Sequence, residues 1–233
     1  MKIIVDAFGG DNAPLAMIEG SLQAHREYGV QILLVGERDK IEQCAKEHNL
    51  PLDGIEILEA QGMIPVEADP TTLLKEYADS SMAVGMQALK DGKGDAFVSA
   101  GSTGALVVGA SLIVKRLKGV RRTAIPTIIP SEKGCFMRID SGANAECNSD
   151  MLLQFGLMGS VYMQKIMGMS SPRVGLINNG TGERKGLEVH RETYQKLQNA
   201  PGNFIGNVRP EGCRWASATW RSATASPATL SSS

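Results

Sequence analysis

Four glycine-containing loops carry the side chains whose types and spacing could do chemistry. Each follows a short apolar run: DAFGGDNAP (6–14), SAGSTG (99–104), RIDSGANAEC (138–147) and NNGTGERKG (178–186). Glycine lets the backbone approach a ligand, and free N–H groups at a following helix can donate to an anion. In open α/β sheets such loops meet beyond the carboxyl ends of the strands. Together with Lys185, they predict a pocket for a small oxyanion.

These loops do not match the patterns that bind nucleotides. Lys185 is followed by Gly186 instead of Ser or Thr, and the spacing before it differs from that of a Walker loop. The first apolar run is not followed by G-x-G-x-x-G with an acidic residue about twenty positions later, so a dinucleotide is not favoured. A turn with a helix cap remains the structural alternative for each loop, since Asp11 and Asn12 are good cap residues.

The composition is typical of a globular α/β protein that acts on small molecules. The chain is 42% hydrophobic and contains 26 glycines, whereas only 5% of its residues are aromatic. Its 24 basic and 25 acidic residues give a net charge of -1, which does not favour nucleic acid as a partner. The cysteines lack C-x-x-C spacing and the three histidines lie far apart, which predicts reduced, unligated thiols and no metal site. The cysteines are Cys44, Cys135, Cys147 and Cys213.

The start of the chain and its apolar runs predict a cytoplasmic protein. MKIIVDAFGG lacks the apolar stretch of a secretory signal. The longest apolar run, 105–114, contains glycine and serine and falls short of the roughly 18 residues that span a bilayer. Attachment to a membrane surface stays open.

Apolar runs alternate with segments of helical spacing along most of the chain. The expected strands cover 2–6, 30–36, 54–60, 95–101, 124–129, 136–140, 173–180 and 203–208, and the expected helices cover 14–27, 39–48, 80–91, 101–117, 151–167 and 187–199. Segment 62–72 contains two prolines and is expected to be an extended excursion. The alternation predicts a doubly wound, mainly parallel sheet with helices on both faces.

Six collinear segments resemble the phosphate acyltransferases of bacterial phospholipid synthesis, the PlsX family. They are VDAFGGDNAP, SAGSTGALVVGA, DSGANAEC, QFGLMGSVY, PRVGLINNGTGERKG and NFIGNV, and the resemblance covers residues 1–208. Phe8 stands where the family usually has methionine, and Ser102 where many members have asparagine. Both departures affect detail more than class, because the Ser102 hydroxyl can still donate or accept a hydrogen bond.

The resemblance implies an enzyme that transfers a fatty acyl group from acyl carrier protein to inorganic phosphate. Its product is an acyl phosphate that feeds a glycerol-3-phosphate acyltransferase. The resemblance further implies a fold similar to the isocitrate and isopropylmalate dehydrogenases and the phosphotransacetylases, a homodimer, and a cytoplasmic protein with peripheral membrane contact. It implies no metal and no organic cofactor.

The predicted pocket fits this chemistry because phosphate dianion is itself a nucleophile and the site need only supply position and charge. We assign the contacts as follows: phosphate or substrate binding to Ser102, Thr103, Gly104, Gly180 and Thr181; pocket shaping to Asp6, Gly9, Gly10, Asp11 and Asn12; and catalytic polar contacts to Asp140, Asn144 and Lys185. Capping or turn formation stays open for each of them. A phosphotransacetylase-like enzyme that uses acyl-CoA and a non-catalytic phosphate-binding remnant are the alternatives, and a dehydrogenase is the weakest.

The composition changes abruptly after Val208. Residues 209–233 contain fourteen Ser, Ala or Thr, both tryptophans and no Val, Ile, Asp or Lys. The family continues instead with a strand and loop resembling D-V-x-V-C-D-G-F-T-G-N. Back-translating 219–229 and moving the frame by one base permits Asp-Val-Ala-Val-Cys-Asp-Gly-Phe-Thr-Gly-Asn, with the alanine forced by TGG-CGN. We therefore expect one family domain over 1–208 that is incomplete at its C-terminus, a disordered out-of-frame segment over 209–233, and impaired activity.

Overall fold

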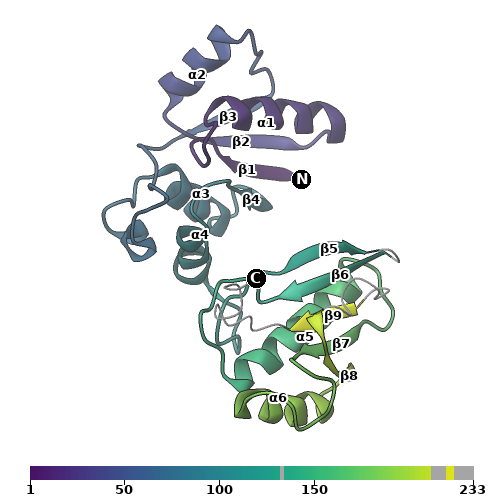
Figure 1. Ribbon diagram of the computed structural model, residues 1–233. Helices are drawn as coiled ribbons and strands as arrows, with labels where there is room; N and C mark the ends of the chain where they lie inside the picture. The colour runs from purple at the N-terminus through teal and green to yellow at the C-terminus, as the bar shows by residue number, and fades with distance from the viewer. Residues whose placement is uncertain (132–133, 211–218, 223–233) are drawn as a thin grey trace, which may run out of the picture. The chain divides into compact units, whose positions relative to one another are not determined.

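The computed structural model divides into two compact units, residues 1–118 and 119–233 (Figure 1). The structure describes residues 1–131, 134–210 and, for the backbone, 219–222. Within this part of the chain, no helix is long and apolar enough to cross a membrane. Each unit has its own sheet and its own buried core, so each is described by itself.

Unit 1 is built on four parallel strands in the order β3-β2-β1-β4. Its elements are β1 (Lys2–Asp6), α1 (Leu15–Tyr28), β2 (Gln31–Gly36), α2 (Arg38–Glu47), β3 (Ile55–Glu59), the 3-10 turn η1 (Pro70–Leu74), α3 (Ser81–Lys90), β4 (Ala96–Val98), α4 (Thr103–Gly109) and the π-helical turn η2 (Ala110–Lys115). The strands and helices lie close to the ranges that hydrophobic periodicity predicts. The expected helix over 101–117 is instead a seven-residue α-helix continued by η2.

Alternating side chains of β2 bury both faces of the unit 1 sheet. Ile32 and Leu34 pack in a cluster with Ile18 of α1 and Ile41 of α2. Leu33 and Val35 belong to a second cluster that includes Ala88 of α3. A strand that is apolar on both faces needs a layer on each side. The expected coverage of both faces by helices is therefore confirmed in unit 1.

Unit 2 contains five strands in the order β5-β6-β9-β7-β8. Its elements are β5 (Thr127–Ser131), β6 (Gly134–Ile139), α5 (Ser149–Lys165), β7 (Arg173–Ile177), α6 (Glu188–Gln198), β8 (Asn203–Val208) and β9 (Thr219–Ser222). Phe155 and Leu152 of α5 pack with Met137, Leu176 and Leu197 in its core.

The expectation of one doubly wound sheet needs correction, because the strands form two sheets. The second sheet also starts with an antiparallel pair, β5 with β6. Only residues 132 and 133 separate these strands, and a parallel pair would need a crossover of about a dozen residues or more. The remaining pairings of that sheet are parallel, so the prediction of a mainly parallel α/β protein is confirmed.

Strand β9 comes from the segment whose composition changes after Val208. Its backbone pairs in parallel with β6 on one side and with β7 on the other. It therefore occupies the centre of the unit 2 sheet. Apart from Arg209, Pro210 and this strand, the expected out-of-frame segment 209–233 lies outside the described residues.

Candidate functional site

The loops after β1 and β4 meet at the carboxyl edge of the unit 1 sheet, because these strands are parallel neighbours. Asp6 ends β1 with only 1% of its surface exposed. The Ser99 hydroxyl donates to Asp6 Oδ2 at 2.7 Å, and the Phe8 N–H donates to Asp6 Oδ1 at 3.2 Å. Ser99 Oγ in turn accepts from the Gly101 N–H at 3.1 Å. A buried carboxylate thus ties the two loops together.

Gly9 permits this close approach of the two loops. A Cβ at this position would lie 2.6 Å from Asp6 Oδ2, 2.7 Å from Ser99 Oγ and 2.9 Å from the Gly101 nitrogen. Gly10 has a φ of +106°, a conformation that favours glycine. The contact between the two loops therefore explains why glycines stand at positions 9 and 10.

A cavity of about 300 Å³ opens beside these loops. The residues assigned to pocket shaping line it, except Asn12, and they are Asp6, Gly9, Gly10 and Asp11. Its apolar wall is formed by Phe8, Ala13, Met63, Ile64, Val66 and Met82. Met63, Ile64 and Val66 belong to the proline-containing excursion 62–72. Neither lysine nor arginine is among the described residues that line it.

Asp11 and Asn12 do not cap α1, so the helix-cap alternative left open for this loop is wrong. The N-cap position is Pro14, and this end of the helix has no side-chain cap hydrogen bond. The chain instead turns before the proline, so the Ala16 N–H bonds to the Asn12 carbonyl. Both side chains are exposed, and Asp11 stands at the cavity.

The hydroxyl of Ser102 caps α4. Ser102 is 5% exposed, and its Oγ accepts from the Ala105 N–H at 3.4 Å. Thr103 is exposed, whereas a Cβ at Gly104 would lie 2.6 Å from Pro70 Cγ. Gly104 thus makes room for η1. The assignment of phosphate to Ser102, Thr103 and Gly104 stays a prediction.

In unit 2, Asp140 organises the loop that follows β6. Asp140 Oδ1 accepts from the N–H groups of Ile125 at 2.8 Å and Ala143 at 3.2 Å. Its Oδ2 accepts from the Asn144 N–H at 2.8 Å and from Asn144 Nδ2 at 3.1 Å. Asn144 Nδ2 also donates to the Thr123 carbonyl at 2.8 Å. Asp140 and Asn144 therefore lie together, and the carboxylate accepts four hydrogen bonds that shape the loop.

Two buried asparagines fix the loop 178–186 that follows β7. Asn178 Nδ2 donates to the Lys185 carbonyl at 2.9 Å, and Asn207 Nδ2 donates to the Gly182 carbonyl at 2.8 Å. The alkyl stem of Lys185 runs beside Gly180, where a Cβ would lie 3.1 Å from Lys185 Cγ. Thr181 and Lys185 are exposed. The loop thus exposes a cation and a threonine to solvent, whereas Gly180 is buried.

The loops after β6 and β7 open at one edge of the unit 2 sheet, because both strands run parallel to β9 between them.

Burial and the Asp140 carboxylate raise the pKa of the Cys147 thiol, so Cys147 is a poor nucleophile at neutral pH. Cys44, Cys135 and Cys147 are free thiols, and Cys213 lies outside the described residues. Over the described residues, we find no cluster of three metal-ligating side chains.

Sequence reasoning missed several residues that position the candidate loops. Ser99, Asn178 and Asn207 stand inside quoted motifs, at strand ends where a polar side chain can bond a neighbouring loop. Met63 and Val66 carried no signal because their excursion fits neither helical nor strand periodicity.

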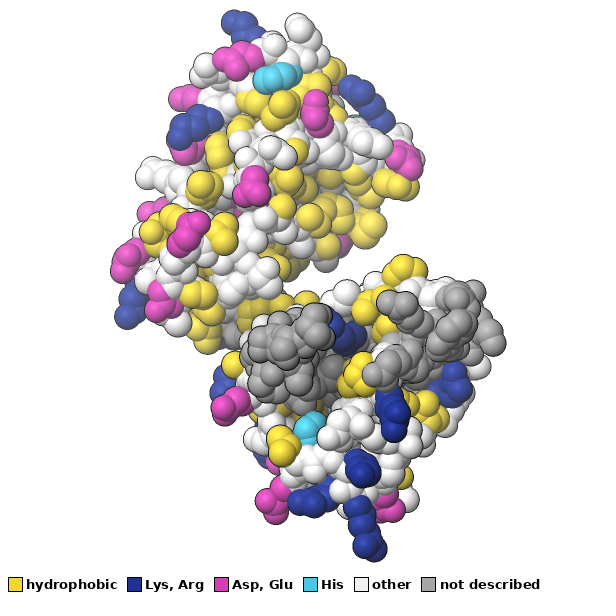
Figure 2. Space-filling view, in the orientation of Figure 1, with side chains coloured by type: hydrophobic (Ala, Val, Ile, Leu, Met, Phe, Trp, Pro, Cys, Tyr) yellow, Lys and Arg dark blue, Asp and Glu magenta, His cyan; other side chains and the backbone are white. Residues whose placement is uncertain are grey.

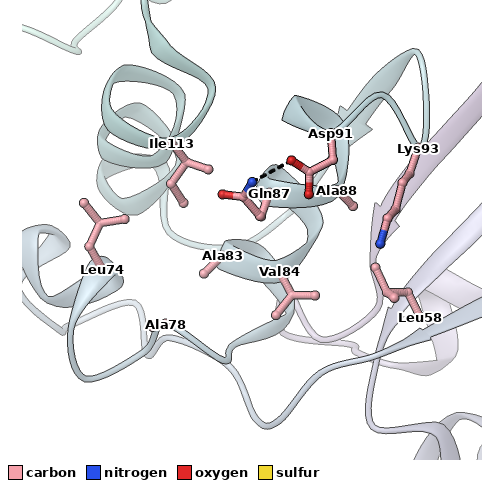
Figure 3. Close-up of a pocket in the computed structure, with 10 residues that line it drawn as sticks. All are labelled: Leu58, Leu74, Ala78, Ala83, Val84, Gln87, Ala88, Asp91, Lys93 and Ile113. Carbon is pink, nitrogen blue, oxygen red and sulfur yellow. Dashed lines mark hydrogen bonds between the residues drawn. The ribbon is translucent and has the colours of Figure 1, made fainter.

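A second cavity in unit 1, of about 310 Å³, involves none of the candidate residues (Figure 3). It is lined by Leu58, Leu74, Ala78, Ala83, Val84, Gln87, Ala88, Asp91, Lys93 and Ile113. The Gln87 amide donates to Asp91 Oδ1 at 2.8 Å, so this polar pair is already satisfied. The arrangement offers no evident chemistry.

The two units carry opposite charge. Residues 1–118 contain 17 acidic and 11 basic residues, whereas residues 119–233 contain 8 acidic and 13 basic residues. On the face in Figure 2, Asp and Glu are frequent on the unit of α1–α4, and Lys and Arg on the unit of α5 and α6. An anionic ligand is therefore better matched by the loops of unit 2.

Comparisons with known proteins cover all four loops. The sequence model of a family described as "Fatty acid synthesis protein" matches residues 1–214. A phosphate acyltransferase of Clostridium kluyveri is 43% identical over 210 residues, which are 90% of this chain and 63% of the relative. One of Caldicellulosiruptor bescii is 44% identical over 89% of this chain and 63% of the relative. The chain thus spans less than two thirds of the length of these curated relatives.

Solved structures show the same fold at low sequence identity. The EutD phosphotransacetylase from Staphylococcus aureus has a TM-score of 0.68 at 19% identity, covering 95% of this chain and 77% of that chain. A 4-hydroxythreonine-4-phosphate dehydrogenase from Burkholderia phymatum has a TM-score of 0.56 at 12% identity, covering 95% of this chain and 79% of that chain. The expected likeness to phosphotransacetylases is confirmed at the level of fold.

Proposed function

This chain belongs to the fatty acid synthesis protein family, and we propose that it transfers a fatty acyl group from acyl carrier protein to inorganic phosphate. The observation that carries the proposal is the match to curated phosphate acyltransferases at 43% identity over 90% of the chain. That span of 210 residues is long enough to include the candidate loops of both units. The product is an acyl phosphate for phospholipid synthesis.

The reaction requires a nucleophile, an electrophile and a place for charge. A phosphate oxygen attacks the thioester carbonyl, the carbonyl oxygen gains charge in a tetrahedral intermediate, and the carbon–sulfur bond breaks to release the thiolate of the carrier. Phosphate dianion is nucleophilic at neutral pH, so no serine or cysteine intermediate is required. One hydrogen-bond donor to the developing oxyanion is worth about 10² to 10³ in rate.

The loop 178–186 has the chemistry to hold phosphate. The exposed Thr181 offers a hydroxyl and the exposed Lys185 a positive charge, while the buried Gly180 contacts the Lys185 side chain and gives it room. The two carboxylates at the unit 1 cavity, Asp6 and Asp11, would repel a dianion. We therefore propose that Lys185 binds the acceptor phosphate electrostatically, with Asp140 and Asn144 shaping the neighbouring loop of the same edge.

Hydroxylamine trapping of acyl phosphate tests this function. The chain is incubated with palmitoyl-acyl carrier protein and phosphate, beside a version with the restored reading frame. Lys185→Met should raise the KM for phosphate about tenfold, as expected for the loss of roughly 1.4 kcal/mol of binding. Lys165→Met, at the end of α5, is the matched control and should leave that KM unchanged. Absence of phosphate-dependent acyl release from both versions would overturn the proposal.

Acyl-CoA is the second candidate donor, because the fold resembles that of phosphotransacetylases. The same assay with palmitoyl-CoA and acetyl-CoA separates the two donors. A higher kcat/KM with acyl carrier protein supports the first proposal, and a higher value with acyl-CoA supports the second. Phosphate binding without turnover by either donor would identify a non-catalytic remnant.

The proposed partners follow from the same reaction. Acyl carrier protein delivers the acyl group, and a glycerol-3-phosphate acyltransferase consumes the acyl phosphate. A homodimer and peripheral membrane contact complete the proposal. Sedimentation of the purified chain, alone and with phospholipid vesicles, tests the last two.

A further inference from the structure

The apolar wall of the unit 1 cavity is not used by the phosphate contacts. Met63 is 53% exposed and Val66 is 62% exposed, and both line the cavity. Ile64 and Met82 line it too and are 5% and 1% exposed. Exposed apolar side chains that border a concave site with a few polar groups are typical of a ligand surface. We therefore expect a ligand to cover these apolar side chains.

The polar side of the cavity indicates that the occupant is not an anion. The Asp6 carboxylate is buried and accepts from Ser99 and Phe8, and the Asp11 carboxylate is exposed at the same cavity. With no lysine or arginine among the described lining residues, a phosphate group would meet negative charge without a counter-ion. A neutral, mostly apolar ligand avoids that cost.

We propose that this cavity binds part of the fatty acyl chain of the thioester donor, with Met63 and Val66 as its contact residues. The inference rests on the proposed function, which requires a donor that is apolar along its chain and neutral at its thioester. At about 300 Å³, the cavity is at the lower end of small-molecule sites, so it holds only part of a long chain. Methionine suits chains of variable shape, because its side chain is flexible and polarisable.

Thioesters with acyl chains of different length measure the affinity of this cavity for the acyl chain without any turnover. The acetyl, hexanoyl and decanoyl thioesters of N-acetylcysteamine are titrated into the full chain in phosphate-free buffer by calorimetry. Affinity should rise about threefold to fourfold for each methylene that leaves water. The double variant Met63→Gln, Val66→Ser should lower the affinity for the decanoyl thioester about tenfold and leave that for the acetyl thioester unchanged.

A matched control and a filling variant exclude a general loss of structure. Val161 is 56% exposed and Met167 is 39% exposed, both at the end of α5 or just after it. The double variant Val161→Ser, Met167→Gln makes the same chemical changes there and should keep the full chain-length dependence. Val66→Trp places a large side chain at the cavity and should weaken decanoyl binding more than acetyl binding.

The outcomes separate this inference from the function on which it rests. Equal affinity for the three thioesters in the unsubstituted chain, or equal loss in the test and control double variants, would overturn the acyl-chain site. Acyl phosphate formation would still stand in that case. Conversely, chain-length dependence that Met63 and Val66 control, without any acyl phosphate from either version of the chain, would overturn the function and leave a site for apolar chains.

Discussion

Both units have polar loops at the carboxyl edge of a sheet, but different interactions hold these loops in place. Unit 1 is acidic, and its loops touch through a buried carboxylate, a serine and a glycine without a side chain. Unit 2 is basic, and a carboxylate and two asparagines hold its loops by hydrogen bonds to the backbone. The difference teaches that loops at the same place in two sheets can carry opposite charge, and the two proposals above, an apolar chain in unit 1 and phosphate in unit 2, rest on it.

The units also differ in how their sheets are completed. All four strands of unit 1 come from 118 consecutive residues. The centre of the unit 2 sheet is instead filled by four residues, TWRS, from the segment of changed composition. A strand with parallel neighbours on both sides is usually a continuous apolar run. The local order of unit 2 therefore depends on a segment poorly suited to its position.

The frameshift expected from the sequence gives the prediction with the largest effect: a chain translated in the other frame after residue 208 should have a more stable unit 2. In the shifted frame, residues 219–222 read Asp-Val-Ala-Val, which has two β-branched apolar residues for the central position. Because position 220 already holds the apolar Trp220, the gain comes mainly from valine in place of Ser222 and should add up to about 3 kcal/mol to the free energy of unfolding of unit 2, before any contribution of the residues that follow. This gain in stability should slow hydrogen exchange in peptides from β6 and β7. Exchange in peptides from β1 and β2 should not change.

The quadruple variant Thr219→Asp, Trp220→Val, Arg221→Ala, Ser222→Val is the control for the strand alone. It should slow exchange in β6 and β7 without restoring the rest of the segment. A coding sequence without a family-like continuation in any frame would contradict the frameshift. Unchanged exchange in both versions would show that β9 adds little order to unit 2.

Removal of the Asp140 carboxylate should be the most damaging single change in either candidate loop. Asp140→Ala leaves the N–H groups of Ile125, Ala143 and Asn144 without their acceptor and should lower the stability of unit 2 by about 3 kcal/mol. Ser99→Ala, the corresponding change in unit 1, removes one donor to Asp6 and should cost about 1.5 kcal/mol. Urea unfolding followed by hydrogen exchange gives both values. The reverse order would mean that the unit 1 contact is the stronger of the two.

A methyl group at Gly9 should separate the loops of unit 1. Gly9→Ala places a Cβ within 2.9 Å of three atoms, so overpacking should cost about 2 kcal/mol and weaken the Ser99–Asp6 hydrogen bond. Gly20→Ala is the matched control, because Gly20 lies in α1 with no neighbour within 4 Å of the added carbon. That change should stabilise the unit by about 0.5 to 1 kcal/mol. Equal shifts in the unfolding midpoint of both variants would contradict the close approach.

Most elements could be predicted from sequence, because periodicity is a local property. The segment over 203–208 is β8, and the run over 2–6 is β1. The division into two sheets was not visible, since hydrophobic runs say nothing of which strands pair. The roles of Asp6 and Asp140 were also hidden: a strand-end aspartate looks the same whether it binds a ligand or a neighbouring backbone.

The pH dependence of α5 is the smallest effect expected, and it also distinguishes the units. The Lys196 ammonium, and then the Arg121 guanidinium, lower the pKa of the Asp150 carboxyl in unit 2. A lowered pKa gives stability that is present above the ordinary aspartate value of about 4 and is lost as pH falls through the native value. Asp150→Asn should therefore lower the unfolding midpoint of unit 2 slightly at neutral pH and flatten its decline below about pH 4.

The matching carboxylate of unit 1 should respond differently. The N–H and hydroxyl of Thr71 lower the pKa of Asp69, which caps η1. Asparagine can accept the same hydrogen bonds at a cap position, so Asp69→Asn should leave the neutral-pH midpoint of unit 1 almost unchanged. Thermal unfolding from pH 3 to pH 7, read by hydrogen exchange in α5 and in η1, compares the two. If Asp150→Asn and Asp69→Asn changed the pH dependence of the unfolding midpoint by the same amount, the ion pairs of Asp150 would contribute no more to unit 2 than the cap contributes to unit 1.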